Sequence, residues 1–288
     1  MHFRMPAWAR FGVAAALTVA GLAVTSAPAS AATAPDCGPT VYKADGTPWV
    51  CTFDDEFNGT TLDRSKWMVQ TTAKNGYAQG GACYFDDPSV VSVSGGQLLL
   101  SAHRFWYAFL CQGYSGILTQ YYAGMVSTYG TFAQTYGRYE FRATFPAVAT
   151  PGLQSTLWMW PQTYAYGANS GEIDVAEWYS QYWDRVIPYL HYNSGSDPNV
   201  TNNYCTLSFG QPHTYDLEWT TFGLTISYDG NVCLTNTHWL PAGMLTPTPF
   251  DQPFFLAMTQ AIGVGGNQPN YWTPADATTK VDWVRVWK

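Results

Sequence analysis

The chain has 288 residues and a formal net charge of −7 at pH 7. This acidic balance argues against a nucleic-acid partner, because nucleic-acid-binding domains carry positive charge that neutralises phosphates. Charged residues make up only 11% of the chain, whereas aromatic residues make up 17%. Aromatic rings offer a flat apolar face, and Trp and Tyr add a polar group, so this composition suits sugar binding as well as the filling of a β-sheet core.

A secretory signal peptide is predicted for residues 1–31. Arg4 and Arg10 carry positive charge, an apolar run covers residues 11–24, and an Ala-Ser-Ala cleavage site closes the segment. The alternative is an uncleaved anchor, but the run is shorter than the roughly 20 residues that a membrane span needs. We therefore expect a secreted protein without membrane association after cleavage, whose residues 32–288 form a single domain.

The six cysteines are expected to form disulfides, because an exported chain meets an oxidising compartment and none of them has the short spacing of a zinc site. Many pairings are open to six cysteines. We predict bridges between sequence neighbours, since each such pair is close enough in the chain to join adjacent strands. The predicted pairs are Cys37 with Cys51, Cys83 with Cys111, and Cys205 with Cys233.

The region after the signal reads as all-β. No helical pattern of useful length occurs, whereas several segments alternate apolar and polar residues and end in turn residues. An Asp229-Gly230 turn between two of these segments predicts a hairpin. The predicted strands include 138–145, 215–219, 224–228, 232–234 and 281–288. Many short strands separated by turns favour a sandwich or jelly roll of two antiparallel sheets, with one broad sheet face free to form a substrate groove.

Three acidic residues lie close together in one predicted strand. Glu172 and Asp174 are two residues apart and face the same side, but Glu177 would face the other side of a regular strand. A β-bulge near Val175 and Ala176 would restore the phase, and bulges are common beside active sites. Three acids so close cannot all be ionised comfortably, so one is expected to hold a proton while another stays an anion. This separation is what acid-assisted glycoside cleavage requires.

Other interpretations of the three acids remain open. The spacing on its own is a pattern that arises by chance in acidic chains. Clustered carboxylates also suit a calcium ion. A line of acids along a strand, with Trp158, Trp160 and Trp178 close to it in the sequence, fits a sugar better than a metal.

Several segments together resemble glycoside hydrolase family 16, the laminarinase-like β-glucanases. The active-site region is matched by Trp158-Met-Trp-Pro161, by Gly171-Glu-Ile-Asp-Val-Ala-Glu-Trp178 and by His191-Tyr192. Further matches follow in order at Asp55-Glu-Phe-Asn-Gly59, Gly95-Gly-Gln-Leu-Leu-Leu100, Tyr136-Gly-Arg-Tyr-Glu-Phe-Arg142, His213-Thr-Tyr-Asp-Leu-Glu-Trp219, Tyr228-Asp-Gly230, Pro253-Phe-Phe-Leu256 and Val281-Asp-Trp-Val-Arg-Val286. The resemblance implies a concanavalin-like β-jelly roll and retaining cleavage that needs no cofactor.

The resemblance also implies roles for individual residues. Glu172 would be the nucleophile, Asp174 its supporting carboxylate and Glu177 the general acid and then base. His191 would lie near the cleavage subsite, and Asp282 would help to hold a structural Ca²⁺ through its carboxylate and backbone carbonyls. We expect Trp158, Trp160 and Trp178 to contact the substrate.

The separation of the two glutamates resembles the bulged form of the family motif, which favours β-1,3-glucan as the polysaccharide substrate. We also expect the enzyme to be a monomer. A β-galactan such as agarose is the alternative substrate. The alternative functions are transglycosylation and non-catalytic carbohydrate binding on the same fold. Three departures from the laminarinase pattern stand out: Ala176 replaces a usual Met, Gln154 replaces a usual Trp, and Val90 stands near a common Asn.

Overall fold

The structure, a computed structural model, describes residues 34–111, 116–194, 197–237 and 247–288. The predicted signal peptide lies outside the described residues. Within the described ranges, the strands are β1 Cys51–Asp55, β2 Met68–Val69, β3 Cys83–Tyr84, β4 Val91–Ser94, β5 Gln97–Leu110, β6 Leu118–Ser127, β7 Gly137–Thr144, β8 Leu153–Pro161, β9 Glu172–Tyr179, β10 Ile187–His191, β11 His213–Thr220, β12 Gly223–Tyr228, β13 Asn231–Asn236, β14 Phe254–Ile262 and β15 Asp276–Trp287, and the one α-helix is α1 Thr72–Asn75. No described helix is long and apolar enough to cross a membrane.

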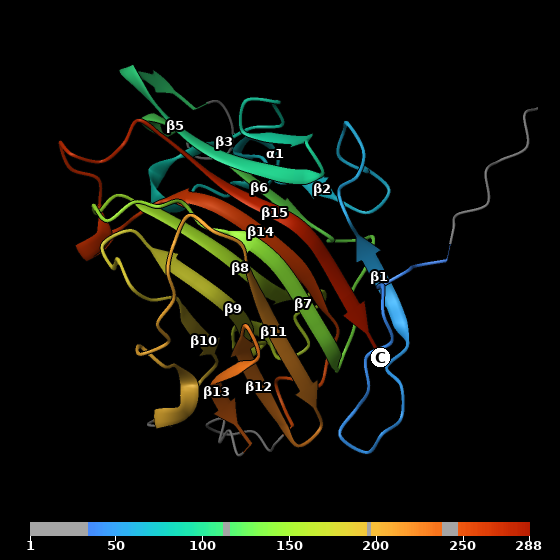
Figure 1. Ribbon diagram of the computed structural model, residues 1–288. Helices are drawn as coiled ribbons and strands as arrows, with labels where there is room; N and C mark the ends of the chain where they lie inside the picture. Colours follow the sequence, from blue (N-terminus) through green and yellow to red (C-terminus); the bar gives the residue numbers. More distant parts are fainter. Residues whose placement is uncertain (1–33, 112–115, 195–196, 238–246) are drawn as a thin grey trace, which may run out of the picture. The chain divides into compact units, whose positions relative to one another are not determined.

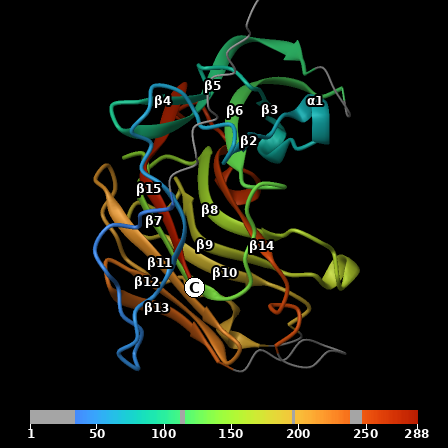
Figure 2. The ribbon, with the colours of Figure 1, turned by 90° about the vertical axis from the view of Figure 1, so that its right-hand side faces the viewer.

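The strands form one hydrogen-bonded path in the order β10-β9-β8-β14-β6-β5-β15-β7-β11-β12-β13. The path curves so that its two halves face each other as two layers (Figures 1 and 2). One layer holds β14, β8, β9 and β10, and the other holds β15, β7, β11, β12 and β13. The prediction of an all-β jelly roll is confirmed, although β3 pairs with β6 in parallel rather than antiparallel.

The hydrophobic core lies between the two layers and is built by period-two alternation. On β7, Tyr139, Phe141 and Ala143 are fully buried on the inner face, whereas the residues between them are only partly buried. Aromatic rings from both layers meet there, and the ring of Phe145, just after β7, stacks on Trp178 of β9 with centroids 6.2 Å apart. Alternating aromatic residues therefore hold the layer that carries the three acids against the other layer.

A small polar cluster lies within this core. Gln260 of β14 accepts hydrogen bonds at Oε1 from the hydroxyls of Ser155 on β8 and Thr279 on β15, each at 2.9 Å. The two hydroxyls are themselves 2.7 Å apart. All three side chains are at most 1% exposed. Because β15 belongs to the opposite layer, the cluster joins the two layers directly.

The local predictions for the hairpin and the disulfides are also confirmed. Strands β12 and β13 are joined by Asp229 and Gly230, whose φ angles are 48° and 77°, as a tight hairpin turn of this kind requires. The three disulfides join Cys37 to Cys51, Cys83 to Cys111 and Cys205 to Cys233. The last of these ties the hairpin to the segment that follows β10.

Candidate active site

Strand β9 carries the three predicted catalytic acids and contains a β-bulge. On the β8 side, Ala176 pairs with Leu157. The next residue of β8, Trp158, pairs with Asp174, so Val175 is the extra residue. The register of β9 against β10 shifts over the same segment. The predicted bulge is therefore confirmed, and as a result all three acids line one groove.

The bulge is contacted from the opposite layer. The hydroxyl of Tyr228, at the end of β12, donates a hydrogen bond of 2.9 Å to the carbonyl oxygen of Val175. Tyr228 is only 3% exposed and Val175 is fully buried. A buried carbonyl needs a hydrogen-bond partner, so Tyr228 stabilises the backbone at the point where the strand changes phase.

The groove runs over the face of β8 and β9 that points away from the core and has a volume of about 980 Å³. Trp158 and Trp160 line it together with the three acids. A second hollow of about 570 Å³ shares Trp160, Glu172 and His191 with the groove. Val264 is among the residues that line the groove, and Asn193 is among those that line the second hollow.

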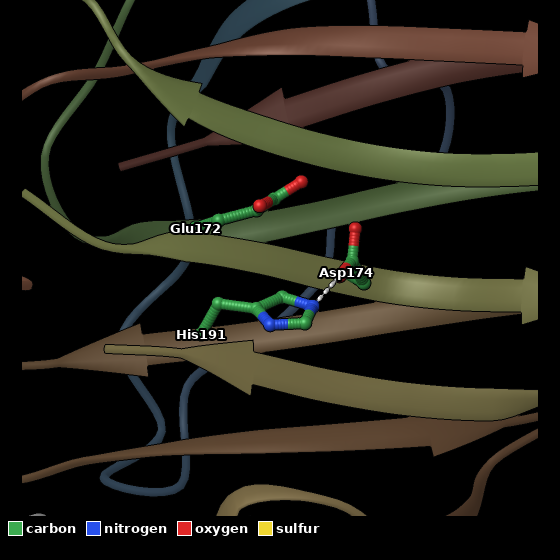
Figure 3. A group of neighbouring side chains, drawn as sticks. All are labelled: Glu172, Asp174 and His191. Atoms are coloured by element: carbon green, nitrogen blue, oxygen red, sulfur yellow. Dashed lines mark ion pairs between the residues drawn. The ribbon is translucent and has the colours of Figure 1, made fainter. Parts of the chain in front are cut away.

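Asp174 is held by a histidine from the neighbouring strand. His191 Nε2 lies 2.8 Å from Asp174 Oδ2, and Figure 3 shows the ring reaching from β10 towards Asp174, with Glu172 beside them. The imidazole stacks on Tyr189 at a centroid distance of 4.0 Å, which fixes the plane of the ring. Asp174 is 2% exposed, so this contact is the polar anchor of a carboxyl group that is otherwise enclosed.

Glu177 is held by two residues of the groove. Tyr179 Oη donates a hydrogen bond of 2.6 Å to Glu177 Oε1. Gln154 Nε2 donates one of 3.1 Å to the same oxygen. Tyr179 and Gln154 are paired with each other across β9 and β8, so the sheet itself places both donors beside Glu177.

Burial raises the pKa of all three acids. The pKa of Glu172 rises to about 8, mainly through burial and then through the charge of Asp174. The pKa of Asp174 lies well above its usual value because of burial and of the neighbouring Glu177. Burial also raises the pKa of Glu177, while the Tyr179 hydroxyl opposes the rise. All three carboxyl groups are therefore harder to ionise than exposed acids, and a proton retained on one of them is what a general acid needs.

The three tryptophans differ in their positions. Trp158 and Trp160 line the groove as predicted, and the Trp158 indole is fixed by a 3.0 Å hydrogen bond from Nε1 to Thr259 Oγ1. The prediction for Trp178 is wrong. Its side chain is fully buried and stacks on Phe145 in the core. Neighbouring residues of a strand point to opposite faces, so Trp178 cannot share the groove with Glu177.

The carboxylate of Asp282 is contacted by two polar side chains. Gln97 Nε2 donates to its Oδ1 at 2.5 Å, and Arg142 Nε lies 3.3 Å from its Oδ2. Calcium takes about six to eight oxygen ligands, whereas these neighbours are donors and one is a cation. Within the described ranges, the only group of three or more metal-ligand side chains is Glu172, Asp174 and His191. The two contacts engage both carboxylate oxygens of Asp282, and the structural Ca²⁺ at this residue stays a prediction.

Comparison with known proteins decides the family. The profile described as "Glycosyl hydrolases family 16" matches residues 83–285, which is more than half of the chain. The chain belongs to glycosyl hydrolase family 16. The resemblance drawn from the sequence motifs is thereby confirmed.

Named relatives of this family 16 chain have several activities. "Glucan endo-1,3-beta-glucosidase A1" of Niallia circulans is 33% identical over an alignment of 267 positions, which covers 82% of this chain and 37% of that protein. "Keratan-sulfate endo-1,4-beta-galactosidase" of Sphingobacterium multivorum is 28% identical over an alignment of 247 positions, which covers 82% of this chain and 54% of that protein. The solved laminarinase from Rhodothermus marinus matches with a TM-score of 0.69 at 26% identity, over 83% of this chain and 97% of that one. The chain thus spans about a third to a half of the two curated relatives.

The sequence interpretation of this family 16 site missed the residues that hold Glu177. Tyr179 could have been found, because it lies two residues after Glu177 and therefore shares its face. Gln154 was noted only as a replacement for a tryptophan. Gln79 Nε2 donates to Gln154 Oε1 at 3.0 Å, and no sequence signal links these two residues, which are 75 positions apart.

Proposed function

We propose that the protein is a secreted, retaining endo-hydrolase of β-1,3-glucan. The observation that carries this proposal is the bulged strand β9, which brings Glu172, Asp174 and Glu177 into one groove beside two tryptophans on a family 16 fold. The names of the glucosidase and galactosidase relatives describe endo-acting enzymes, which supports internal cleavage of a long chain over removal of end units. The glucanase and laminarinase among the relatives support the choice of polysaccharide.

The proposed reaction has two steps. In the first, the Glu172 carboxylate attacks the anomeric carbon while Glu177 gives its proton to the departing glycosidic oxygen, so that a glycosyl ester forms and the C–O bond breaks. In the second, Glu177 takes a proton from water, whose oxygen attacks the same carbon and releases Glu172. Two inversions give net retention. Asp174, anchored by His191, lies next to the nucleophile. While Asp174 is protonated, it adds no negative charge beside Glu172.

A β-galactan is the second candidate substrate. It is favoured by the keratan-sulfate galactosidase relative and by Gln154, an amide at a position where an aromatic residue would suit a glucan ring better. A reducing-end assay on laminarin, lichenan, agarose, carrageenan and galactan separates the two candidates. Laminarin is expected to give the highest rate, and a higher rate on a galactan would replace the glucan proposal.

The proposed roles are tested by Glu172→Gln and Glu177→Gln. Each substitution keeps the side-chain shape and removes the nucleophile or the acid, so the release of reducing ends from laminarin is expected to fall at least about 100-fold. Glu218→Gln is the matched control, because Glu218 is exposed and bonded to Arg138 on the other layer. Wild-type rates in both groove variants would rule out the mechanism, and an α-anomer as the first product would rule out retention. Binding to insoluble glucan without any product would favour a carbohydrate-binding protein.

The remaining proposals concern the mature protein. We propose that residues 1–31 are removed on export and that residues 32–288 act as a single, monomeric catalytic domain. The mass of the secreted protein and its light-scattering mass in solution test these statements.

A further inference from the structure

The general acid proposed above has an asymmetric environment. Both hydrogen bonds that Glu177 accepts, from Tyr179 Oη and from Gln154 Nε2, end on the same oxygen, Oε1. In the part of the chain that the structure describes, no side chain or backbone group donates to Oε2. A carboxyl oxygen has two lone pairs for hydrogen bonds, so Oε1 is fully used and Oε2 is not.

The direction of the Gln154 amide is fixed by its other neighbours. Gln154 Oε1 accepts a hydrogen bond of 3.0 Å from Gln79 Nε2, so the Gln154 Nε2 group must point to Glu177. Gln79 Oε1 in turn accepts a hydrogen bond from the Tyr77 hydroxyl. The orientation of an amide follows from the network around it, and here Tyr77, Gln79 and Gln154 form a chain in which every donor points towards Glu177.

Backbone contacts keep this chain in place. Gln79 begins the short 3₁₀ turn Gln79–Gly81, which packs against the end of β14. A side chain at Gly80 would put its Cβ 2.0 Å from the carbonyl oxygen of Ile262, so only glycine allows the turn to come this close. Gln154 itself is 3% exposed and has little freedom to choose another partner.

Tyr179 is a donor under all ordinary conditions. Burial, followed by the charge of Glu177, raises the pKa of its hydroxyl far above the usual range, so the proton stays on Tyr179. If the proton of Glu177 lay on Oε1, it would displace one of the two donors, whereas on Oε2 it displaces none.

We propose that Tyr179 and Gln154 are positioning residues that occupy Oε1 of Glu177 and thereby confine its catalytic proton to Oε2. This inference rests on the proposed role of Glu177 as the general acid. In the first step, the Oε2–H bond breaks as the proton forms a bond to the glycosidic oxygen and the glycosidic C–O bond breaks. In the second step, a proton from water returns to Oε2. The two donors stay on Oε1 throughout, so no hydrogen bond has to be rearranged during the cycle.

The test uses Tyr179→Phe and Gln154→Met on two substrates. Laminarin has a poor leaving group that needs protonation, whereas 2,4-dinitrophenyl β-laminaribioside has one that leaves without it. For laminarin, kcat/KM is expected to fall about 10- to 100-fold in each variant, through kcat rather than KM. For the aryl substrate, kcat/KM is expected to stay within about threefold of wild type. Equal losses on the two substrates, or no loss on either, would overturn the proposal.

The pH dependence gives a second measurement that a merely structural role would not change. Donors to a carboxylate stabilise its ionised form, so the loss of either donor should raise the pKa of Glu177. The alkaline limb of kcat/KM on laminarin is then expected to move to higher pH in both variants. Tyr182→Phe is the matched control, because Tyr182 packs edge-on against Tyr179 and does not line the groove, and its profile should match wild type.

Failure of the proposed function can be told apart from failure of this inference. If the wild-type protein cleaves none of the polysaccharides or the aryl substrate, the proposed function fails. The carboxyl pKa of Glu177, followed by ¹³C NMR on selectively labelled protein, still tests the positioning role. A higher pKa in Tyr179→Phe and Gln154→Met than in wild type and Tyr182→Phe supports it, and an unchanged pKa overturns it.

Discussion

At the scale of single residues, the groove contains three buried acids, and their burial lowers the stability of the folded protein. Glu172, Asp174 and Glu177 lie on one face of one strand, and burial is the largest cause of the raised pKa of each. Moving an ionised carboxyl group from water into the protein interior costs free energy of folding. A raised pKa in a cleft is also what acid–base chemistry requires, so the properties that support catalysis are the ones that reduce stability.

Glu172 makes this conflict measurable. Its pKa rises from 4.5 to about 8 on folding, so the folded state binds more protons than the unfolded state between these two values. The contribution of Glu172 to stability is therefore fully present below pH 4.5 and is lost as the pH rises to about 8. Glu172→Gln removes this loss and is expected to raise the free energy of unfolding at pH 8.5 by up to about 4–5 kcal/mol.

Urea denaturation of Glu172→Gln and wild type at several pH values checks this prediction. Well below pH 4.5 the two proteins should differ little, because the wild-type carboxyl is then neutral in both the folded and the unfolded state. A variant that is less stable than wild type at pH 8.5, or a difference that does not change with pH, would contradict the assigned pKa.

The sequence predicted correctly which side chains lie together where a motif and a phase argument agreed. That the three acids share one groove followed from their spacing and the phase of a bulged strand. Trp178 failed because it was chosen for its nearness to Glu177 in the sequence, although adjacent strand residues face opposite sides. The contact between Gln79 and Gln154 could not be predicted, since it depends on how a turn far away in the chain packs against β14.

At the scale of elements, the bulge in β9 depends on a hydrogen bond from the other layer. Tyr228→Phe removes the hydroxyl that donates to Val175 O and leaves the ring in place. The substitution is expected to cost about 1–2 kcal/mol of stability and to lower kcat on laminarin up to about tenfold, because the spacing of the acids depends on the bulge. Thermal unfolding and initial rates measure the two effects.

Tyr215→Phe is the matched control for this prediction. Tyr215 is fully buried and its ring lies 5.1 Å from that of Tyr228, but among the described residues its hydroxyl has no hydrogen-bond partner. Removal of that hydroxyl should leave stability equal or higher and activity unchanged. Equal behaviour of the two variants would show that the bond to Val175 has no role.

Strands could be predicted from the sequence where apolar and polar residues alternate regularly. β7, β11 and the β12–β13 hairpin were predicted from alternation and from one turn dipeptide, because such strands have one face in the core and one outside it. The two-residue strand β3 and its parallel pairing with β6 were not predicted. Strands this short carry too few residues for a period, and their pairing is set by the segments around them.

At the scale of the whole molecule, the two layers are aligned by more than apolar packing. Thr279, Ser155 and Gln260 join β15 to β8 and β14 inside the core. Thr279→Val keeps the volume of the side chain but leaves Gln260 with one donor fewer, and it is expected to cost about 1–3 kcal/mol. For a domain of this size, that cost lowers the melting temperature by roughly 2–10 °C.

Thr278→Val is the control on the neighbouring position. Thr278 is partly exposed and pairs with Ser101 on the other face of the same layer, so its substitution should change stability by less than about 1 kcal/mol. Calorimetry of both variants distinguishes the two sites. If Thr279→Val were as stable as wild type, apolar packing alone would account for the alignment of the layers.

The bulge in β9 also limits how this chain can change in evolution. A substitution at Val175 or Ala176 alters only what faces the core, but the loss or gain of a single codon between Glu172 and Glu177 would turn Glu177 away from the groove and move Trp178 out of the core. Positions 175 and 176 can therefore vary in composition, but the segment can hardly vary in length, whereas turns at the surface can accept both kinds of change.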